Sequence, residues 1–181
     1  QPDRINGRGR KVNYSPVKSS GLSHDIPVYQ PDSLKNPEEQ EKLKALSPDL
    51  LVVIAYGKIL PKAVLDIPTY GAINVHASLL PKYRGAAPIQ RVIIDGEKET
   101  GVTIMQLDEG MDTGNIISAV KMAIPPHMNA GELFDQLGSL GARELIHVLD
   151  DLPEKLKHSI PQNQEEASYA EKITKDMGHL D

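Results

Sequence analysis

The sequence feature that most constrains the fold is a continuous apolar run, LLVVIA, at residues 50–55, with Pro48 before it and Gly57 after it. Because the run is short and rich in β-branched side chains, it favours a strand over a helix. A strand with no polar alternation is typical of a sheet covered on both faces, as in parallel α/β proteins. We therefore predict a strand at 49–55 that is buried on both faces. The run is also far shorter than the ~20 residues that span a bilayer.

Predicted helices and strands alternate around this run. Helices are predicted at 37–47, 59–66, 87–95 and from 130 to about 149, and strands at 72–76, 101–107 and 116–124. This order indicates βαβ units, and hence an α/β fold with a mainly parallel sheet and helices on both faces. The loop at 108–115 is too short for a parallel crossover, so the last two strands are expected to form an antiparallel addition. Residues 1–18 are predicted as a loop, and the polar segment 153–181 as a linker after a domain spanning 1–152.

The composition excludes several classes of function. The 181 residues include no cysteine, which excludes disulfides, thiolate metal ligands and a cysteine nucleophile. The six histidines show no zinc-type spacing, and the GxGxxG, P-loop and GxSxG motifs are absent, so we expect no metal and no phosphate-binding glycine loop. With a net charge of −5 and 4% aromatic residues, any nucleic-acid contact must come from a local basic patch. No stretch reads as a signal peptide, which fits a bacterial cytoplasm or an organellar matrix.

Residues 1–18 form such a basic patch. Its charged residues are Arg4, Arg8, Arg10, Lys11 and Lys18, against a single Asp3. Gly7 and Gly9 make the backbone pliable, and clustered arginines on a flexible segment can follow a nucleic-acid backbone. The alternative interpretation is a solvated surface loop, which the charge alone favours.

Catalytic chemistry is indicated at residues 74–78, NVHAS, at the end of the predicted second strand. Because side chains alternate along a strand, Asn74 and His76 point to one face, at the strand end where open α/β sheets bind ligands. An amide and an imidazole side by side can hold an oxyanion. Asp112, in the acidic loop that follows the third strand, could orient His76 or move a proton. The alternatives are polar side chains that satisfy a strand end, and a plain acidic turn or weak divalent-ion site.

Five segments, in order and spacing, resemble the 10-formyltetrahydrofolate-dependent formyltransferase family. They are NVH (74–76), SLLP (78–81), YRGAAPI (83–89), GVTIM (101–105) and MDTG (111–114). The resemblance covers nearly the whole chain and implies a Rossmann-like formyltransferase domain whose catalytic residues fall on Asn74, His76 and Asp112. It implies 10-formyltetrahydrofolate as co-substrate, without a metal. The folate-binding stretches of the family fall on Ser78, Leu79, Leu80 and Pro81 and on Tyr56, Gly57, Ile59 and Leu60.

Within this family, the basic first segment resembles the loop of the members that formylate initiator methionyl-tRNA. The resemblance implies transfer of a formyl group to the α-amino group of methionyl-tRNA for translation initiation, by a monomer. The tRNA contacts would be Arg4, Arg8, Arg10 and Lys11. The alternatives are a formyltransferase acting on a sugar nucleotide or on glycinamide ribonucleotide, and a non-catalytic fragment that binds folate or tRNA. The family pattern also places a first strand before Gln1 and a β-barrel domain after Asp181.

Overall fold

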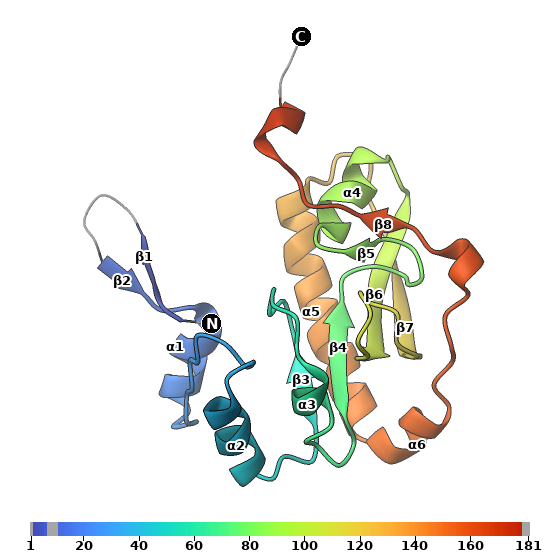
Figure 1. Cartoon of the computed structure of the whole chain (residues 1–181). Coiled ribbons are helices and arrows are strands. Elements are labelled where there is room, and N and C mark those ends of the chain that lie inside the picture. The colour runs from blue at the N-terminus through green and yellow to red at the C-terminus, as the bar shows by residue number, and fades with distance from the viewer. Residues whose placement is uncertain (1, 7–10, 179–181) are drawn as a thin grey trace. The chain divides into compact units, whose positions relative to one another are not determined.

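The computed structural model describes residues 2–6 and 11–178, and the chain divides into two compact units, Gln1–Leu46 and Ser47–Asp181. Figure 1 shows the elements of both units. Among the described residues, no helix combines the length and the apolar character that crossing a membrane requires.

The first unit contains two strands and two helices. Strands β1 (Arg4–Asn6) and β2 (Lys11–Asn13) pair in antiparallel fashion, and helices α1 (Pro16–Ser23) and α2 (Pro37–Ala45) follow. The prediction of an unbroken loop at 1–18 was therefore wrong. The signal for α1 was in the sequence, because Ser15 caps the helix by accepting the Lys18 N–H and Pro16 occupies its first turn. Asn36 caps α2 as predicted, through the Glu38 N–H.

The second unit is built on a mixed four-stranded sheet. Its strands are β3 (Leu51–Val53), β4 (Ala72–His76), β6 (Glu99–Gln106) and β7 (Ile116–Ala123), and they lie in the order β3-β4-β6-β7. The β3–β4 pair is parallel, with α3 (Lys62–Leu65) in the crossover, whereas β4–β6 and β6–β7 are antiparallel. The predicted antiparallel pair of the last two strands is confirmed.

Two details of the sheet differ from the predictions. The connection between β4 and β6 contains α4 (Pro88–Ile94) but leads to an antiparallel strand, because alternation of strand and helix does not fix strand direction. Strand β3 is not buried on both faces, since Val52 is 41% and Ile54 is 56% exposed. Among the described residues, β3 pairs only with β4, so it is an edge strand here.

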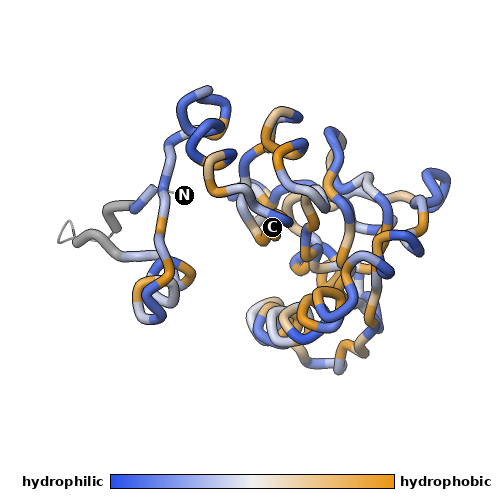
Figure 2. Tube along the Cα trace, turned by 90° about the horizontal axis from the view of Figure 1, so that it is seen from below, coloured by the Kyte–Doolittle hydropathy of each residue, from blue (hydrophilic) through white to orange (hydrophobic). Residues whose placement is uncertain are grey.

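The core of the second unit lies between the sheet and helix α5 (Ala130–Leu149). The helix begins at a capping box formed by Asn129 and Glu132, as predicted. Its buried leucines, Leu133 and Leu137, pack with Ile73 of β4, and α4 adds buried side chains to the same cluster. Figure 2 shows the apolar segments of this unit converging between strands and helices. Each fully buried leucine contributes roughly 1.5–3 kcal/mol through the hydrophobic effect.

The C-terminal segment returns to the loop that follows β4. It contains α6 (Leu152–Lys157), a 3-10 turn (Gln164–Glu166), strand β8 (Tyr169–Ala170) and a second 3-10 turn (Lys175–Gly178). Strand β8 pairs in parallel with β5 (Arg84–Gly85). The linker predicted at 153–181 therefore carries regular structure within the same compact unit. The domain boundary at residue 152 stays a prediction.

Candidate active site

Strand β4 presents two polar side chains on the sheet face that points away from the α5 core. Ile73 is fully buried in the core cluster, and the alternation of the strand sends Asn74 and His76 to the other face. Their antiparallel neighbours on β6 are Met105 and Thr103. His76 is 5% exposed and Asn74 is half-buried. In the described part of the chain, the Asn74 carboxamide makes no hydrogen bond, so its donor is available to a ligand.

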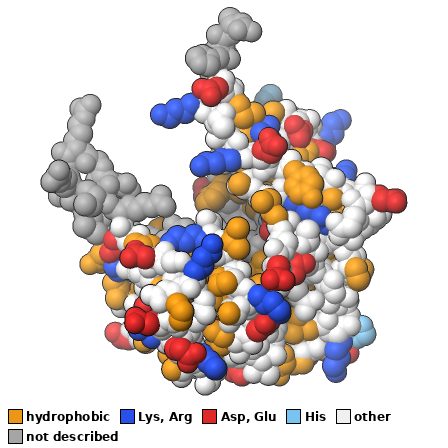
Figure 3. All heavy atoms as spheres, in the orientation of Figure 1, with side chains coloured by type: hydrophobic (Ala, Val, Ile, Leu, Met, Phe, Trp, Pro, Cys, Tyr) orange, Lys and Arg blue, Asp and Glu red, His pale blue; other side chains and the backbone are white. Residues whose placement is uncertain are grey.

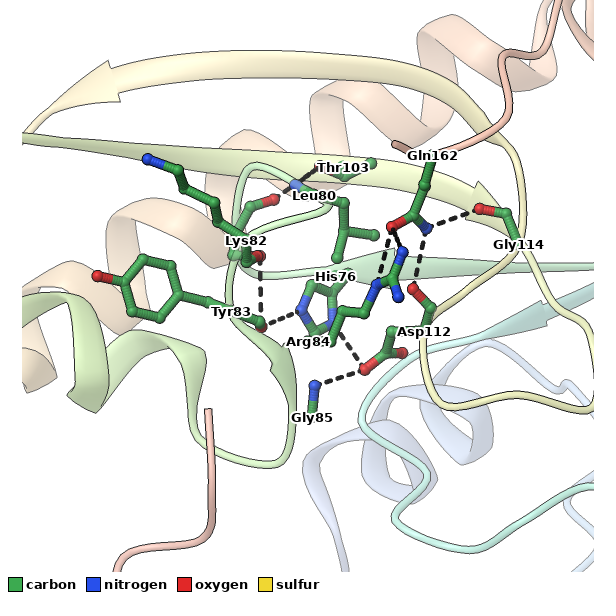
Figure 4. A network of polar contacts seen from close by, with 11 residues as sticks. His76, Leu80, Lys82, Tyr83, Arg84, Gly85, Thr103, Asp112, Gly114 and Gln162 are labelled. Carbon is green, nitrogen blue, oxygen red and sulfur yellow. Dashed lines mark hydrogen bonds and ion pairs between the residues drawn. The ribbon is translucent and has the colours of Figure 1, made fainter. Parts of the chain in front are cut away.

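The His76 ring is held from both sides (Figure 4). Its Nε2 lies 2.8 Å from the carbonyl oxygen of Tyr83, and because a carbonyl only accepts, Nε2 carries the hydrogen. Its Nδ1 lies 3.6 Å from Asp112 Oδ2, which also accepts the Gly85 N–H at 2.8 Å. The structure thus brings Asp112 to the imidazole from a distant loop. His76 already donates to the protein, so Asn74 is the freer of the two expected oxyanion donors.

Hydrogen bonds from a side chain to backbone carbonyl oxygens hold the loop that carries Asp112. Asp112 has a φ of +53°, in the left-handed region that favours glycine. The carbonyl oxygens of Asp112 and Gly114 both accept from Gln162 Nε2, at 2.9 and 2.7 Å. Gln162 in turn accepts from the guanidinium of Arg84. Sequence reasoning missed both residues as part of the site.

The stretch 78–81 is fixed mainly by contacts within the protein. Ser78 is fully buried, and its hydroxyl donates to the Lys82 carbonyl oxygen at 2.6 Å. The Thr103 hydroxyl donates to the Ser78 carbonyl oxygen and accepts the Leu80 N–H. Leu80 is 7% exposed and precedes Pro81 through a cis peptide bond. The side chains of this stretch that stay partly accessible are those of Leu79 and Pro81.

The second predicted folate stretch follows β3 at the same sheet edge. Because β3 and β4 are parallel, residues 56–60 leave the sheet at the end where Asn74 and His76 lie. Tyr56 and Leu60 are half-buried, Gly57 is exposed with a φ of +68°, and Ile59 is 81% exposed. An exposed apolar side chain in a segment that leaves the sheet at this end is able to contact an apolar ligand face.

Tyr83 anchors the far end of the loop that holds His76. Its hydroxyl donates to Asp95 Oδ2 and Glu97 Oε1, each at 2.9 Å. Burial is the main cause that raises the pKa of Tyr83 above its ordinary value, and the hydrogen bonds to the two carboxylates add to it.

Of the predicted tRNA contacts, two lie in the described part of the chain. Arg4 belongs to β1 and Lys11 to β2, whereas Arg8 and Arg10 lie outside the described residues. Nearby, Lys18 pairs with Asp3 at 2.6 Å, and this hydrogen bond lowers the pKa of the Asp3 carboxyl.

A cavity of about 350 Å³ lies elsewhere on the second unit. Its lining includes Lys62, Asp66 and Glu109, together with Gly71 and Ala72 at the amino end of β4. Ligands of open α/β sheets bind at the carboxyl ends of the strands, so the cavity is not the candidate active site.

Comparison with known proteins identifies the family. A family model described as formyl transferase matches residues 1–149. The chain belongs to the formyl transferase family. The methionyl-tRNA formyltransferases of Hydrogenovibrio crunogenus and Marinobacter nauticus are 52% and 51% identical to it over 181 residues. The alignments cover all of this chain but 58% of each of these formyltransferases.

Solved formyltransferase structures share the fold. Phosphoribosylglycinamide formyltransferase from Bacillus halodurans matches with a TM-score of 0.64 and 29% identity, over 77% of this chain and 72% of that one. An N-formyltransferase from Helicobacter canadensis, solved with folinic acid and dTDP-3-aminofucose, matches with a TM-score of 0.67 and 24% identity, over 84% and 52%. These similarities confirm the predicted α/β, Rossmann-like fold class.

Proposed function

We propose that the protein containing this chain transfers a formyl group from 10-formyltetrahydrofolate to the α-amino group of initiator methionyl-tRNA. The relatives that support this are about 50% identical over the whole chain. The observation that carries the chemistry is the approach of the Asp112 carboxylate to the His76 ring, on the face of β4 that His76 shares with Asn74. Because the chain spans 58% of the length of these relatives, the activity of the whole protein is part of the proposal.

The folate would lie between the two stretches that end β3 and β4. Ile59, Leu79 and Pro81 offer apolar contact, and the exposed backbone at Gly57 offers polar contact to a pterin ring. The bound folate supplies an activated formyl group. Since Ser78 is buried and bonded within the protein, its role is to hold the loop in shape.

The side chains of Asn74 and Asp112 assist the attack of the amine on the formyl carbon. An α-amino group has a pKa of roughly 7.7–8.0, so a neutral, nucleophilic fraction exists near pH 7. The bond from its nitrogen to the formyl carbon forms as the carbonyl becomes an oxyanion, and Asn74 donates a hydrogen bond to that oxygen. Asp112, oriented by Gly85 and facing His76, accepts the proton that the amine loses. The proton leaves with the folate nitrogen as its bond to the formyl carbon breaks.

The basic segment would recognise the tRNA. Arg4 belongs to β1 and Lys11 to β2, and Arg8 and Arg10 lie between them in the sequence; we assign all four to phosphate contacts. The alternative acceptors are glycinamide ribonucleotide and an amino-sugar nucleotide. The likeness to a phosphoribosylglycinamide formyltransferase favours the first of these alternatives.

A competition between acceptors tests the proposal. The complete reading frame that encodes this chain is expressed, and the purified protein is given 10-formyltetrahydrofolate with equal amounts of methionyl-tRNA, glycinamide ribonucleotide and an amino-sugar nucleotide. We expect formyl-methionyl-tRNA as the main product. Formylation of either small acceptor in preference to the tRNA would contradict the assignment, and no transfer to any acceptor would contradict the activity itself.

A further inference from the structure

Arg84 is a buried, charged side chain that pairs with no carboxylate among the described residues. It is 0% exposed, and in the described part of the chain its hydrogen bonds go to two neutral amides. Its Nε and Nη2 donate to Gln162 Oε1 at 3.0 and 2.7 Å, and its Nη1 donates to Gln164 Oε1 at 2.8 Å. A guanidinium stays charged in proteins, and burying one is costly unless its donors are satisfied. This cost points to a role beyond packing.

Gln162 connects that guanidinium to the catalytic loop (Figure 4). Its Oε1 accepts from Arg84, and its Nε2 donates to the carbonyl oxygens of Asp112 and Gly114. Because a guanidinium only donates, Arg84 fixes which end of the carboxamide faces the loop. Gln162 is 7% exposed, so water does not readily replace either contact.

The loop needs this outside support. A non-glycine residue in the left-handed region costs roughly 1–2 kcal/mol, and Asp112 has a φ of +53°. In this conformation its carboxylate reaches both the Gly85 N–H and His76 Nδ1. A relaxed backbone at Asp112 would move the carboxylate away from the imidazole.

Three consecutive residues of the β5 region thus hold His76 and Asp112, directly or through Gln162. The Tyr83 carbonyl oxygen orients His76, the Arg84 side chain acts through Gln162, and the Gly85 N–H holds Asp112. Parallel pairing of β5 with β8 and the hydrogen bond from the Arg84 N–H to Ser168 O tie this stretch to the C-terminal segment.

We propose that Arg84 and Gln162 are positioning residues, and that the Gln162 carboxamide locks the Asp112 loop in its left-handed, catalytically competent conformation. This inference rests on the proposed formyl transfer. In this proposal the segment after residue 152 contributes a positioning residue, Gln162, to the active site.

Two matched substitutions test the role of the Gln162 donor, in the complete protein. Gln162→Glu keeps an acceptor for Arg84 but cannot donate to the Asp112 and Gly114 carbonyl oxygens. Gln164→Glu places the same new charge beside Arg84, makes no contact with that loop, and gives up only the long hydrogen bond of 3.4 Å to the Gln162 carbonyl oxygen. We expect Gln162→Glu to lower kcat about 10- to 100-fold with KM values near wild type, and Gln164→Glu to change kcat less than about threefold. Equal losses in both variants, or none in Gln162→Glu, would overturn the proposal.

Nuclear magnetic resonance gives a readout that does not depend on turnover. In the wild-type protein both Gln162 side-chain amide protons should exchange slowly with water, and the Gly85 amide resonance should shift in Gln162→Glu but not in Gln164→Glu. Fast exchange of the Gln162 amide in the wild type would refute the lock even if the variant does not fold. If the wild type formylates no acceptor while these signals behave as expected, the proposed function fails and the lock stands.

Discussion

Asn74 and His76 share one face of β4, but the protein holds them differently. Both nitrogens of the His76 ring face protein oxygens, whereas the Asn74 carboxamide makes no hydrogen bond in the described part of the chain. A free amide can turn toward a ligand without breaking a contact, whereas the His76 ring would have to give up its hydrogen bond to the Tyr83 carbonyl oxygen. In the proposed mechanism the two residues therefore have different roles: Asn74 reaches the reacting oxygen, and His76 keeps Asp112 in place.

Asn74→Ala is expected to separate turnover from stability. Removing one oxyanion donor should lower kcat by about 10²–10³. The melting temperature should stay near wild type, because the side chain is half-buried and supports no other group. The matched control is Asn129→Ala, which removes a helix cap far from the site along the chain and should cost about 1 kcal/mol of stability with kcat unchanged. Wild-type turnover in Asn74→Ala would exclude this residue from catalysis.

Tyr83 makes stability depend on pH at the alkaline end. Burial and the carboxylates of Asp95 and Glu97 raise its pKa in the folded protein, whereas the pKa of a tyrosine hydroxyl in the unfolded chain is about 10. A raised folded pKa contributes stability below pH 10, and this contribution is lost as the pH rises through the folded pKa. We expect the difference in unfolding free energy between wild type and Tyr83→Phe to be constant from pH 7 to 9. Above pH 10 the wild type should lose stability relative to Tyr83→Phe, as measured by urea denaturation. A difference in unfolding free energy that does not change with pH would contradict the raised pKa.

At the scale of elements, the close approach of α5 to β4 supports the strand that carries the site. Gly141 of α5 lies so near the sheet that an added Cβ would come within 2.9 Å of Val75 Cγ1. Val75 stands between Asn74 and His76, so a displaced strand would move both side chains. The spacing of the apolar residues predicted the helix, but it could not show that residue 141 has to be glycine.

Two glycines of α5 are expected to respond in opposite directions. Gly141→Ala should destabilise the protein by about 1–3 kcal/mol, because the methyl group overpacks against Val75. Gly138→Ala meets no atom within 4 Å and should stabilise the helix by up to about 1 kcal/mol. Chemical denaturation of both variants measures the two values. A neutral or stabilising Gly141→Ala would show that α5 and β4 do not approach as closely as described.

Elements with a periodic pattern or a cap were predictable from the sequence. The strand at 72–76 was predicted with its observed bounds, and the Asn129–Glu132 capping box located the start of α5. Strands β5 and β8 were not predictable, because a two-residue strand leaves no pattern and exists only through its partner. Strand direction was likewise set by tertiary pairing, as at β4–β6.

The site, too, was predictable from the sequence only in part. Alternation along one strand predicted Asn74 and His76 on one face, the acidic loop suggested Asp112 as a partner of His76, and the resemblance to a family assigned all three to catalysis. Arg84 and Gln162 gave no usable signal, because a buried arginine and a glutamine in a polar segment look like surface residues until the partner is known. Buried polar networks of this kind depend on contacts between residues far apart in the chain.

At the scale of the whole molecule, the two units hold different parts of the proposed function. The unit 47–181 holds the proposed chemistry, and the unit 1–46 holds the basic hairpin region. On the face shown in Figure 3, positive, negative and apolar side chains of the described residues are interspersed. With a net charge of −5, binding of a polyanion depends on a local group of arginines and lysines.

Salt dependence tests whether that group is residues 4–11. Removing one cation that neutralises a phosphate should reduce the slope of log affinity against log salt by about 1, so Arg8→Ala should weaken tRNA binding most at low salt and flatten its salt dependence. The control is Lys121→Ala, which removes an exposed positive charge from β7 that is paired with Glu99. Filter binding of tRNA across a salt series, with the KM for the folate measured in parallel, separates the two variants. If Arg8→Ala and Lys121→Ala give the same slope as wild type, Arg8 makes no phosphate contact and its assignment to tRNA binding is wrong.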